Sequence, residues 1–396
     1  MIGRFLHRLA ERCRPRPRQP AEPRTDWTTD AASLAVRLKA MRDDCSQCGA
    51  CAVNCAFLTN RGLPGALATR YDFTDPDQQR IAYQCSLCGL CAALCPEGLD
   101  PCGLFLAIRR RHVEAGCFNP RPYRPLLVYE RLGSSALFSS HSIPRGCTTV
   151  FFPGCALPGT RPSVTLQTYQ RLRRAMPSLG LVLDCCAKPS HDLGRTACFH
   201  DRFDALLDRL ERRGVHTVLT ACPNCTMIFR QYGRGLNVRT VYEALRLNGV
   251  PADLHGAAAA EISVHDPCPL RNDSQTQTAV RGLLTDLGYA VAEMRHCKNF
   301  TVCCGEGGGV GFAEPRLAAE WTGLRLREAG SRRMATYCAG CCAALSRTTP
   351  TVHILDLLFR PEPARNNALT VTRPPMTYVN RLLLKLRVKR IVRDAL

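Results

Sequence analysis

The sequence predicts an α+β multidomain protein in which a small helical domain precedes a duplicated α/β domain. Three observations lead to this prediction. A cysteine motif occurs twice in tandem near the N-terminus, short apolar strands alternate with helices after residue 147, and that alternation repeats at a period of roughly 115 residues. Because 396 residues are enough for two or three domains with a substantial core, we expect each part to fold around a core of its own.

The composition is that of a globular protein with many thiols. Hydrophobic residues make up 45% of the chain, which argues against disorder, and 25 residues are cysteine. An odd cysteine count in a chain of this length argues against a small secreted disulfide scaffold. The arginine-rich N-terminus has no apolar core of a signal peptide, and no run reaches the ~18–20 apolar residues of a spanning helix. We therefore expect a cytoplasmic protein, in which clustered cysteines bind metal.

The net charge of +20 raises the question of nucleic-acid binding. The arginines are scattered along the chain, and no basic run is interleaved with aromatic residues as a base-stacking surface would require. We therefore expect no nucleic-acid partner.

Two cysteine motifs near the N-terminus have the spacing C-x2-C-x2-C-x3-C. This is the spacing of bacterial two-cluster ferredoxins, in which the fourth cysteine of each run binds the other cluster. The predicted ligands are Cys45, Cys48, Cys51 and Cys95 for one [4Fe–4S] cubane, and Cys85, Cys88, Cys91 and Cys55 for the other. A pair of zinc sites is the alternative, but zinc normally takes two separated cysteine pairs, so the third cysteine of each run favours iron.

The segment between the two motifs is typical of helix–turn–helix structure, with RGLPG as the break. We expect a helical ferredoxin-type domain over residues 41–110. A basic arm over 1–40 precedes it, and a linker over 111–146 follows it.

Both copies of the repeated part follow one plan of Rossmann-like α/β type. In the first, over 147–255, the strands TTVFFPGCA, LGLVLDCCAKP and VHTVLTACPNC each end at cysteines. In the second, over 256–358, AEISVHDPCPL, the segment from YAVAEM to CCGEGGG, and MATYCAGCC do the same. Sites in open α/β sheets gather at the carboxyl ends of strands, so we expect the cysteines of each copy to meet at one edge of its sheet.

Each copy has the pattern C-x(about 30)-CC-x(about 35)-C-x2-C, and here the sequence resembles the cysteine-rich CCG-domain iron–sulfur proteins related to heterodisulfide reductase. Similar subunits occur in glycolate oxidase and anaerobic glycerol-3-phosphate dehydrogenase, and the domain order resembles the D-type subunit of heterodisulfide reductase. The resemblance implies that five cysteines hold a non-cubane [4Fe–4S] centre. The two sets would be Cys155, Cys185, Cys186, Cys222 and Cys225, and Cys268, Cys303, Cys304, Cys338 and Cys341.

The first copy departs from this family, because Ala187 stands where the family has glycine. The resemblance therefore implies two cubane clusters with one or two non-cubane clusters, zinc being the alternative occupant of the first copy. In the second copy the glycines after Cys304 are expected to bring backbone N–H groups against sulfur.

Several further cysteines and histidines have no assigned partner. Cys342 is either an additional ligand or a small buried residue. For His191, His200 and His265, which lie near motif cysteines, we expect a helix-cap or core role rather than ligation. We expect ordinary buried thiols at Cys13, Cys102, Cys117, Cys147, Cys198 and Cys297.

The resemblance implies an oxidoreductase iron–sulfur subunit, active with partner subunits. Two cubane clusters would pass electrons to or from a non-cubane centre that handles a disulfide or a quinone-like acceptor. In the alternative, the chain relays electrons to quinone from a separate flavin-dependent 2-hydroxy-acid (glycolate or lactate) or glycerol-3-phosphate dehydrogenase. The implied partners are a flavoprotein or a membrane quinone-reactive subunit.

Residues 359–396 form a basic tail with an amphipathic helical pattern. One face carries Leu384, Val388, Ile391 and Ala395, and the adjoining row carries Arg381, Lys385, Lys389 and Arg393. Such a helix packs on its own domain, docks on a partner subunit, or lies on the cytoplasmic face of the inner membrane.

Overall fold

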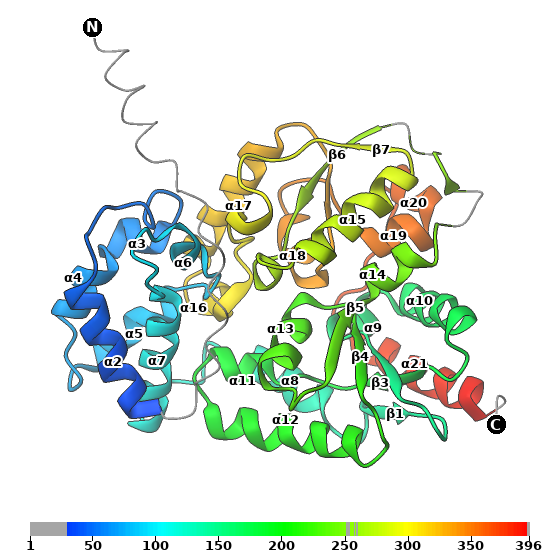
Figure 1. Ribbon diagram of the computed structural model, residues 1–396, viewed down its shortest axis with the longest axis horizontal. Coiled ribbons are helices and arrows are strands. Elements are labelled where there is room, and N and C mark those ends of the chain that lie inside the picture. Colours follow the sequence, from blue (N-terminus) through cyan, green and yellow to red (C-terminus); the bar gives the residue numbers. More distant parts are fainter. Residues whose placement is uncertain (1–29, 251–253, 257, 259, 394–396) are drawn as a thin grey trace, which may run out of the picture.

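The computed structural model describes residues 30–250, 254–256, 258 and 260–393 (Figure 1). Most of the expected N-terminal arm, including Cys13, lies outside the described residues. The helical N-terminal part consists of α2 (Asp30–Asp43), α3 (Ala56–Arg61), α4 (Pro64–Thr69), α5 (Pro76–Ile81), the short 3-10 helix η1 (Ala82–Gln84), α6 (Leu90–Leu94) and α7 (Pro101–Glu114).

Local signals explain where these helices begin and end. Asp75 caps α5 and Asp100 caps α7, each followed by a proline at the first helical position. The RGLPG segment separates α3 from α4, as its proline and glycines predict. The helices α2, α4 and α7 pack together around a core that includes Leu38, Phe57 and Phe105.

A mixed sheet of five strands forms the first α/β unit. Its strands are β1 (Ser140–Ser142), β2 (Thr149–Phe152), β3 (Gly180–Leu183), β4 (Thr217–Thr220) and β5 (Asn237–Thr240). Their order is β1-β3-β2-β4-β5, with β1 antiparallel to β3 and the other pairs parallel. The helices of this unit are α8 (Arg124–Gly133), α9 (Ala156–Thr160), α10 (Pro162–Ala175), α11 (Lys188–Asp192), α12 (Thr196–Glu211), α13 (Pro223–Tyr232) and α14 (Val241–Leu247).

The second unit repeats this arrangement with four parallel strands. They are β6 (Ala260–His265), β7 (Tyr289–Val291), β8 (Met334–Thr336) and β9 (Thr351–His353), in the order β7-β6-β8-β9. Its helices are η3 (Cys268–Leu270), α15 (Ser274–Asp286), η4 (Lys298–Phe300), η5 (Gly307–Gly309), α16 (Val310–Ala313), α17 (Pro315–Ala329), α18 (Ala339–Leu345), α19 (Ile354–Phe359) and α20 (Pro361–Arg365). Strands β2, β3, β4 and β5 therefore correspond to β6, β7, β8 and β9.

The predicted order, a helical domain followed by two α/β units, is confirmed. The middle strands are buried on both faces, as a parallel sheet covered by helices requires. The segment expected as a linker contains α8 and β1, and β1 adds an antiparallel edge to the first sheet.

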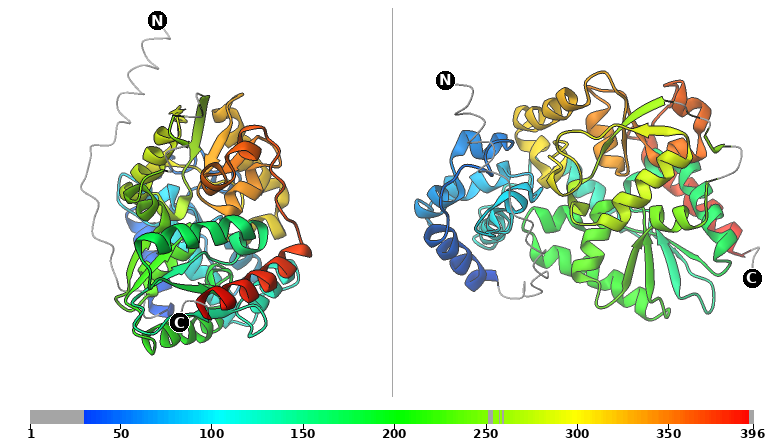
Figure 2. Two further views of the ribbon diagram at one scale, coloured as in Figure 1. Left: turned by 90° about the vertical axis from the view of Figure 1, so that its right-hand side faces the viewer. Right: turned by 45° about the horizontal axis from the view of Figure 1, so that its top comes forward.

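The C-terminal helix α21 (Met376–Arg393) lies against the first unit, on the side away from the helical N-terminal part (Figures 1 and 2). It contacts α9, α10 and β1. Leu384 and Val388 are buried, and Arg381 is 2% exposed and donates a hydrogen bond of 3.1 Å to the Gly133 carbonyl. The tail thus packs on its own domain; the side chain of Ile391 and all of Ala395 lie outside the described residues.

The glycines of CCGEGGG form a close contact between the second unit and the helical part. A Cβ added to Gly307 would lie 2.6 Å from the Ser86 carbonyl oxygen. One added to Gly308 would lie 2.7 Å from the Cys85 carbonyl oxygen. These distances are too short for a methyl group, so the two backbones meet directly because the glycines have no side chains.

Candidate iron–sulfur centres

The first predicted ferredoxin set lines one small cavity of the helical domain. Cys45, Cys48, Cys51 and Cys95 all face it, and Cys91 also contributes to its wall. Cys95 comes from the second motif, so the structure brings the fourth cysteine of one run to the first three of the other. Cys48 is exposed, and the remaining members are half-buried. This set lies near the molecular surface.

The second ferredoxin set lines a deeper cavity. Cys55, Cys85, Cys88 and Cys91 face it together with Cys303 from the second α/β unit. Cys85, Cys91 and Cys303 are buried. The cavity therefore adjoins a cysteine that the sequence assigned to a different centre.

Both ferredoxin motifs have the same unusual backbone. The residue before the second cysteine is left-handed without being glycine, with φ of 51° at Gln47 and 53° at Leu87. The glycine after that cysteine is also left-handed, with φ of 78° at Gly49 and 72° at Gly89. Strained conformations of this kind cluster at ligand-binding loops, where they turn successive backbone N–H groups inward. The Leu87 N–H accordingly donates to the Cys85 sulfur at 3.4 Å.

In the first α/β unit, five cysteines converge at the carboxyl ends of β2, β3 and β4. The sulfurs of Cys186 and Cys225 are 3.3 Å apart. The Cys155 and Cys185 thiols are hydrogen-bonded to each other, as are those of Cys222 and Cys225. The five cysteines predicted for this copy therefore lie close together, and Cys222 also contacts Cys338 of the second unit.

The second unit assembles its five cysteines in the same way. The sulfurs of Cys304 and Cys341 are 3.2 Å apart. Hydrogen bonds from the thiols of Cys268 and Cys304 lower the pKa of Cys303 well below its ordinary value, and the Cys338 sulfur contacts Cys341. Unlike Cys185, which follows β3 directly, Cys303 comes after a longer loop that contains η4.

The glycine expected to donate to sulfur does so in the second copy. The Gly305 N–H donates to Cys303 Sγ at 3.3 Å, and Gly305 has a φ of 90°. Its counterpart Ala187 is also left-handed, with a φ of 55°. The first copy therefore keeps the backbone turn but places a strained alanine there.

The donor chemistry of these cavities fits metal clusters. Burial raises the pKa of Cys51 to about 11 and that of Cys55 to about 12. Thiolates, which are the metal-binding form, are disfavoured at such sites unless a cation offsets the desolvation. The sulfur groupings and the mainly apolar lining of the deeper cavity are those expected for thiolate-bound iron.

The sequence did not identify the side chain that joins the second centre to the ferredoxin loop. Arg271, three residues after Cys268, donates to the Cys88 carbonyl at 2.6 Å and to the Thr301 carbonyl at 3.2 Å. Its position directly after η3, which begins at the predicted ligand Cys268, was the available signal. A single arginine among the many in this chain cannot be recognised on that ground.

The remaining singled-out residues lie as follows. Cys342 is turned away from the five-cysteine group, because its sulfur accepts a hydrogen bond of 3.3 Å from Arg161. Both ring nitrogens of the buried His191 are hydrogen-bonded, to Asp192 at 2.9 Å and Tyr232 at 3.0 Å. His200 is exposed. His265 lies beside Cys304 and Cys341.

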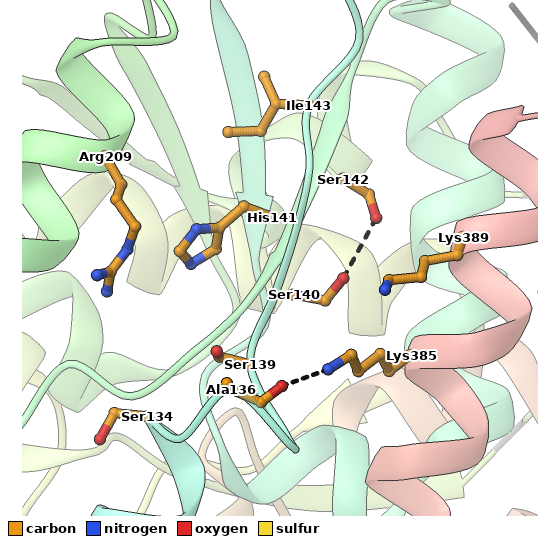
Figure 3. A pocket seen from close by; sticks show the side chains of 10 residues that line it. All are labelled: Ser134, Ala136, Ser139, Ser140, His141, Ser142, Ile143, Arg209, Lys385 and Lys389. Atoms are coloured by element: carbon orange, nitrogen blue, oxygen red, sulfur yellow. Dashed lines mark hydrogen bonds between the residues drawn. The ribbon is translucent and has the colours of Figure 1, made fainter.

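An open polar pocket lies between α21, α12 and β1 (Figure 3). His141, Arg209, Lys385 and Lys389 line it with several serines, and Lys385 donates to the backbone carbonyls of Ala136 and Leu137. No helix in the described part of the chain combines the length and apolar character needed to cross a bilayer.

Two domain families match this chain. Residues 17–100 match the 4Fe-4S dicluster domain, and residues 149–230 and 262–346 each match the cysteine-rich domain. The matched ranges contain both ferredoxin motifs and both five-cysteine sets.

Several curated proteins are similar over most of the chain. The D subunit of dihydromethanophenazine:CoB–CoM heterodisulfide reductase from Methanosarcina barkeri is 26% identical over 62% of this chain and 67% of the relative. The D subunit of the same enzyme from Methanosarcina mazei is 23% identical over 79% of this chain and 89% of the relative. The B subunit of a fumarate reductase (CoM/CoB) from Methanothermobacter marburgensis is 26% identical over 60% of this chain, and the match spans 50% of the relative.

The tandem ferredoxin motifs, the duplicated five-cysteine sheets and these matches agree. The chain belongs to the cysteine-rich CCG-domain iron–sulfur proteins and is an oxidoreductase subunit of the heterodisulfide-reductase-like type.

Proposed function

We propose that this chain is an iron–sulfur electron-transfer subunit that connects a partner protein to a disulfide or quinone-like acceptor at the second cysteine-rich centre. The first ferredoxin set would hold one [4Fe–4S] cubane and the second set the other. The second α/β set would hold a non-cubane [4Fe–4S] centre, and the first α/β set a further non-cubane cluster or zinc. When bound, these groups would supply one-electron transfer.

The single observation that carries this proposal is the position of Cys303. It lines the cavity of the second ferredoxin set and contacts Cys268 and Cys304 of the second α/β set. One side chain thus belongs to the walls of both sites. Because this junction is buried, water is excluded from the space between them.

The exposure of the two ferredoxin sets supports electron transfer from the protein surface toward the interior. The first ferredoxin set includes the exposed Cys48, whereas Cys85 and Cys303 are buried. A partner subunit can therefore approach the first set, while the second set has no comparable exposure. We propose a flavoprotein or a quinone-reactive membrane subunit as that partner.

The alternative function, relay from a separate flavin-dependent dehydrogenase to quinone, gains support from α21. Its outer face exposes Met376, Val379, Leu383 and Leu386, with the exposed Arg387 nearby. An apolar row flanked by basic residues suits a peripheral contact with an anionic membrane, where quinones reside. This contact would place the chain on the cytoplasmic face of the inner membrane.

Iron and sulfide analysis of anaerobically purified protein tests the cofactor content. About sixteen irons would indicate four full sites, about twelve an empty or zinc-bound first α/β set, and about eight the ferredoxin pair alone. Iron and sulfide near zero would instead make the chain a zinc-stabilised or metal-free binding protein.

The acceptor is tested with reduced viologen as donor and either a mixed disulfide or a soluble quinone as acceptor. Cys304→Ala should abolish reduction of the preferred acceptor while the EPR signals of the two cubanes persist. Cys342→Ala is the matched control, because this buried neighbour of Cys341 contacts Arg161 instead. Full activity in Cys304→Ala would overturn the assignment of the second centre.

A further inference from the structure

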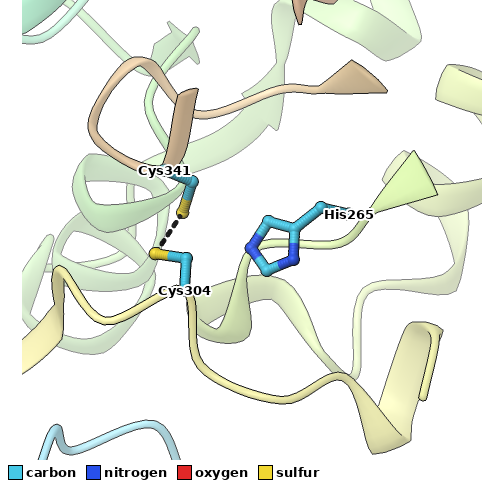
Figure 4. Close-up of side chains that lie close together, drawn as sticks. All are labelled: His265, Cys304 and Cys341. Carbon is cyan, nitrogen blue, oxygen red and sulfur yellow. Dashed lines mark hydrogen bonds between the residues drawn. The ribbon is translucent and has the colours of Figure 1, made fainter. Parts of the chain in front are cut away.

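A buried histidine lies beside the second five-cysteine set. His265 ends β6, three residues before Cys268, and is 1% exposed. Its imidazole points toward the sulfurs of Cys304 and Cys341 (Figure 4). One ligand atom from each of these three residues lies within 4.8 Å of the others. This separation allows the three atoms to bind a common metal centre.

The imidazole lacks the protein contacts that would explain its burial. Its Nδ1, on the side of the ring away from the two sulfurs in Figure 4, has no hydrogen-bond partner among the described residues. The buried His191, by contrast, uses both ring nitrogens in hydrogen bonds to Asp192 and Tyr232. The nitrogen that faces Cys304 and Cys341 in Figure 4 is Nε2, and no hydrogen bond from a described residue reaches it. Its lone pair is therefore available to a metal centre.

The duplication supplies an internal comparison. Phe152 stands three residues before Cys155, as His265 stands three residues before Cys268, and β2 corresponds to β6. The Phe152 ring packs edge-on against Phe229, with centroids 5.0 Å apart.

The sulfurs of the two copies, by contrast, are arranged alike. Cys186 and Cys225 are 3.3 Å apart, and Cys304 and Cys341 are 3.2 Å apart. The two sites thus share this close pair of sulfurs, and the second adds a nitrogen where the first has a phenyl ring. A purely structural role could be filled by an apolar side chain, as the first copy demonstrates.

We propose that His265 is a nitrogen ligand of the iron centre in the second cysteine-rich copy, so that the two duplicated centres differ in ligand type. The inference rests on the proposed function only in requiring iron at this set. Imidazole binds iron well, and it brings no charge to the centre, whereas a thiolate at the same position would bring a negative charge. With histidine rather than cysteine at position 265, the second centre would therefore have the higher reduction potential.

Pulsed EPR on the wild-type holoprotein tests this without any variant. The paramagnetic state of the second centre should show a strong hyperfine coupling to nitrogen. This coupling should change when the protein is produced with 15N-histidine in place of histidine of natural isotope content. His265→Phe, which installs the residue of the first copy, should remove that coupling.

His353→Phe is the matched control. His353 is also buried at a strand end and has an unpartnered Nε2, but it lies outside the group with Cys304 and Cys341. This substitution should leave the nitrogen coupling unchanged.

A redox titration provides a second readout. His265→Cys should keep the iron count of the wild type and shift the midpoint potential of the second centre to a lower value, because a thiolate adds negative charge. An unchanged potential in a fully loaded variant would contradict ligation.

The outcomes separate this inference from the proposed function. Absence of iron from the second set, or zinc in its place, would overturn both. The assignment of His265 as a ligand would alone be overturned if the second set holds iron but shows no histidine-dependent nitrogen coupling. A coupling as weak as that of backbone nitrogens would overturn it equally.

Discussion

The guanidinium of Arg109 donates a hydrogen bond of 2.8 Å to the backbone carbonyl of Gly308. Arg109 lies on α7 of the helical domain, is fully buried, and also donates to the carbonyl of Asp192 at 2.7 Å. Further bonds reach the carbonyls of Ala82 and Cys85. A single side chain therefore fastens the ferredoxin part to both α/β units, and its donors are satisfied by backbone oxygens.

We expect Arg109→Leu to weaken this three-way junction. It would leave several buried carbonyls without donors, at about 1–3 kcal/mol for each that stays unpaired. The urea midpoint of the anaerobic holoprotein should fall, and limited proteolysis should cut between α7 and α8. Arg111→Leu, on the same helix but less buried, is the control. Equal midpoints for the two variants would argue against the junction.

Gly308→Ala should separate the ferredoxin loop from the second centre. Gly308 is left-handed, with a φ of 62°, and its added Cβ would lie 2.7 Å from the Cys85 carbonyl oxygen. We expect a loss of about 2–4 kcal/mol of stability from strain and overpacking.

Stopped-flow spectroscopy should also show slower reduction of the second centre in Gly308→Ala. Gly214→Ala is the control, since Gly214 has a φ of 69° and open space around its Cβ position. That variant should show the backbone strain alone, with normal electron transfer.

Substitutions directly after the paired cysteines should affect iron binding in the second copy but not in the first. Gly305→Ala would place a Cβ 2.5 Å from the Ala318 carbonyl oxygen, so we expect loss of the iron bound by the second set. Ala187→Gly removes the strain of a left-handed alanine, and its iron content should stay unchanged. Iron analysis and thermal unfolding of both variants test this. Full iron loading in Gly305→Ala would contradict the steric argument.

The proposed crossed ligand sets predict which cysteine substitutions remove the same cluster. Cys95 lines the same cavity as Cys45, whereas Cys55 lines the deeper one. Cys45→Ser and Cys95→Ser should therefore remove the same cubane EPR signal, and Cys55→Ser the other. Loss of the same EPR signal in Cys45→Ser and Cys55→Ser, with Cys95→Ser affecting the other, would reject the crossed assignment.

The C-terminal helix should contribute to stability through one face only. Leu384 is 2% exposed against the first unit, and Leu383 is 49% exposed. We expect Leu384→Ala to cost about 2–4 kcal/mol and Leu383→Ala less than about 0.5 kcal/mol in thermal unfolding. If Leu383→Ala instead reduces binding to anionic vesicles, the outer face is the membrane contact proposed above.

The class of fold and the grouping of the cysteines follow from the order of the amino acids alone. Cysteine spacing is a local property, and the residues that follow parallel strands must meet at one edge of a sheet, so the five-cysteine sets could be named before any coordinates. The edge strands β1, β5 and β9 were not predicted, because segments of three or four residues such as SHS and TVH become strands only through their neighbours.

The contacts between the helical domain and the two α/β units depend instead on how the folded chain packs. The motif CCGEGGG predicted glycines whose N–H groups donate to sulfur, and Gly305 does so. Gly307 and Gly308 instead allow close approach of the ferredoxin-loop backbone, because they have no side chains. Arg109 cannot be distinguished from Arg110 and Arg111 in the sequence, and the sequence favoured a core or cap role for His265. Each role depends on which distant side chains and carbonyls surround the residue, and that is a property of packing between domains rather than of local pattern.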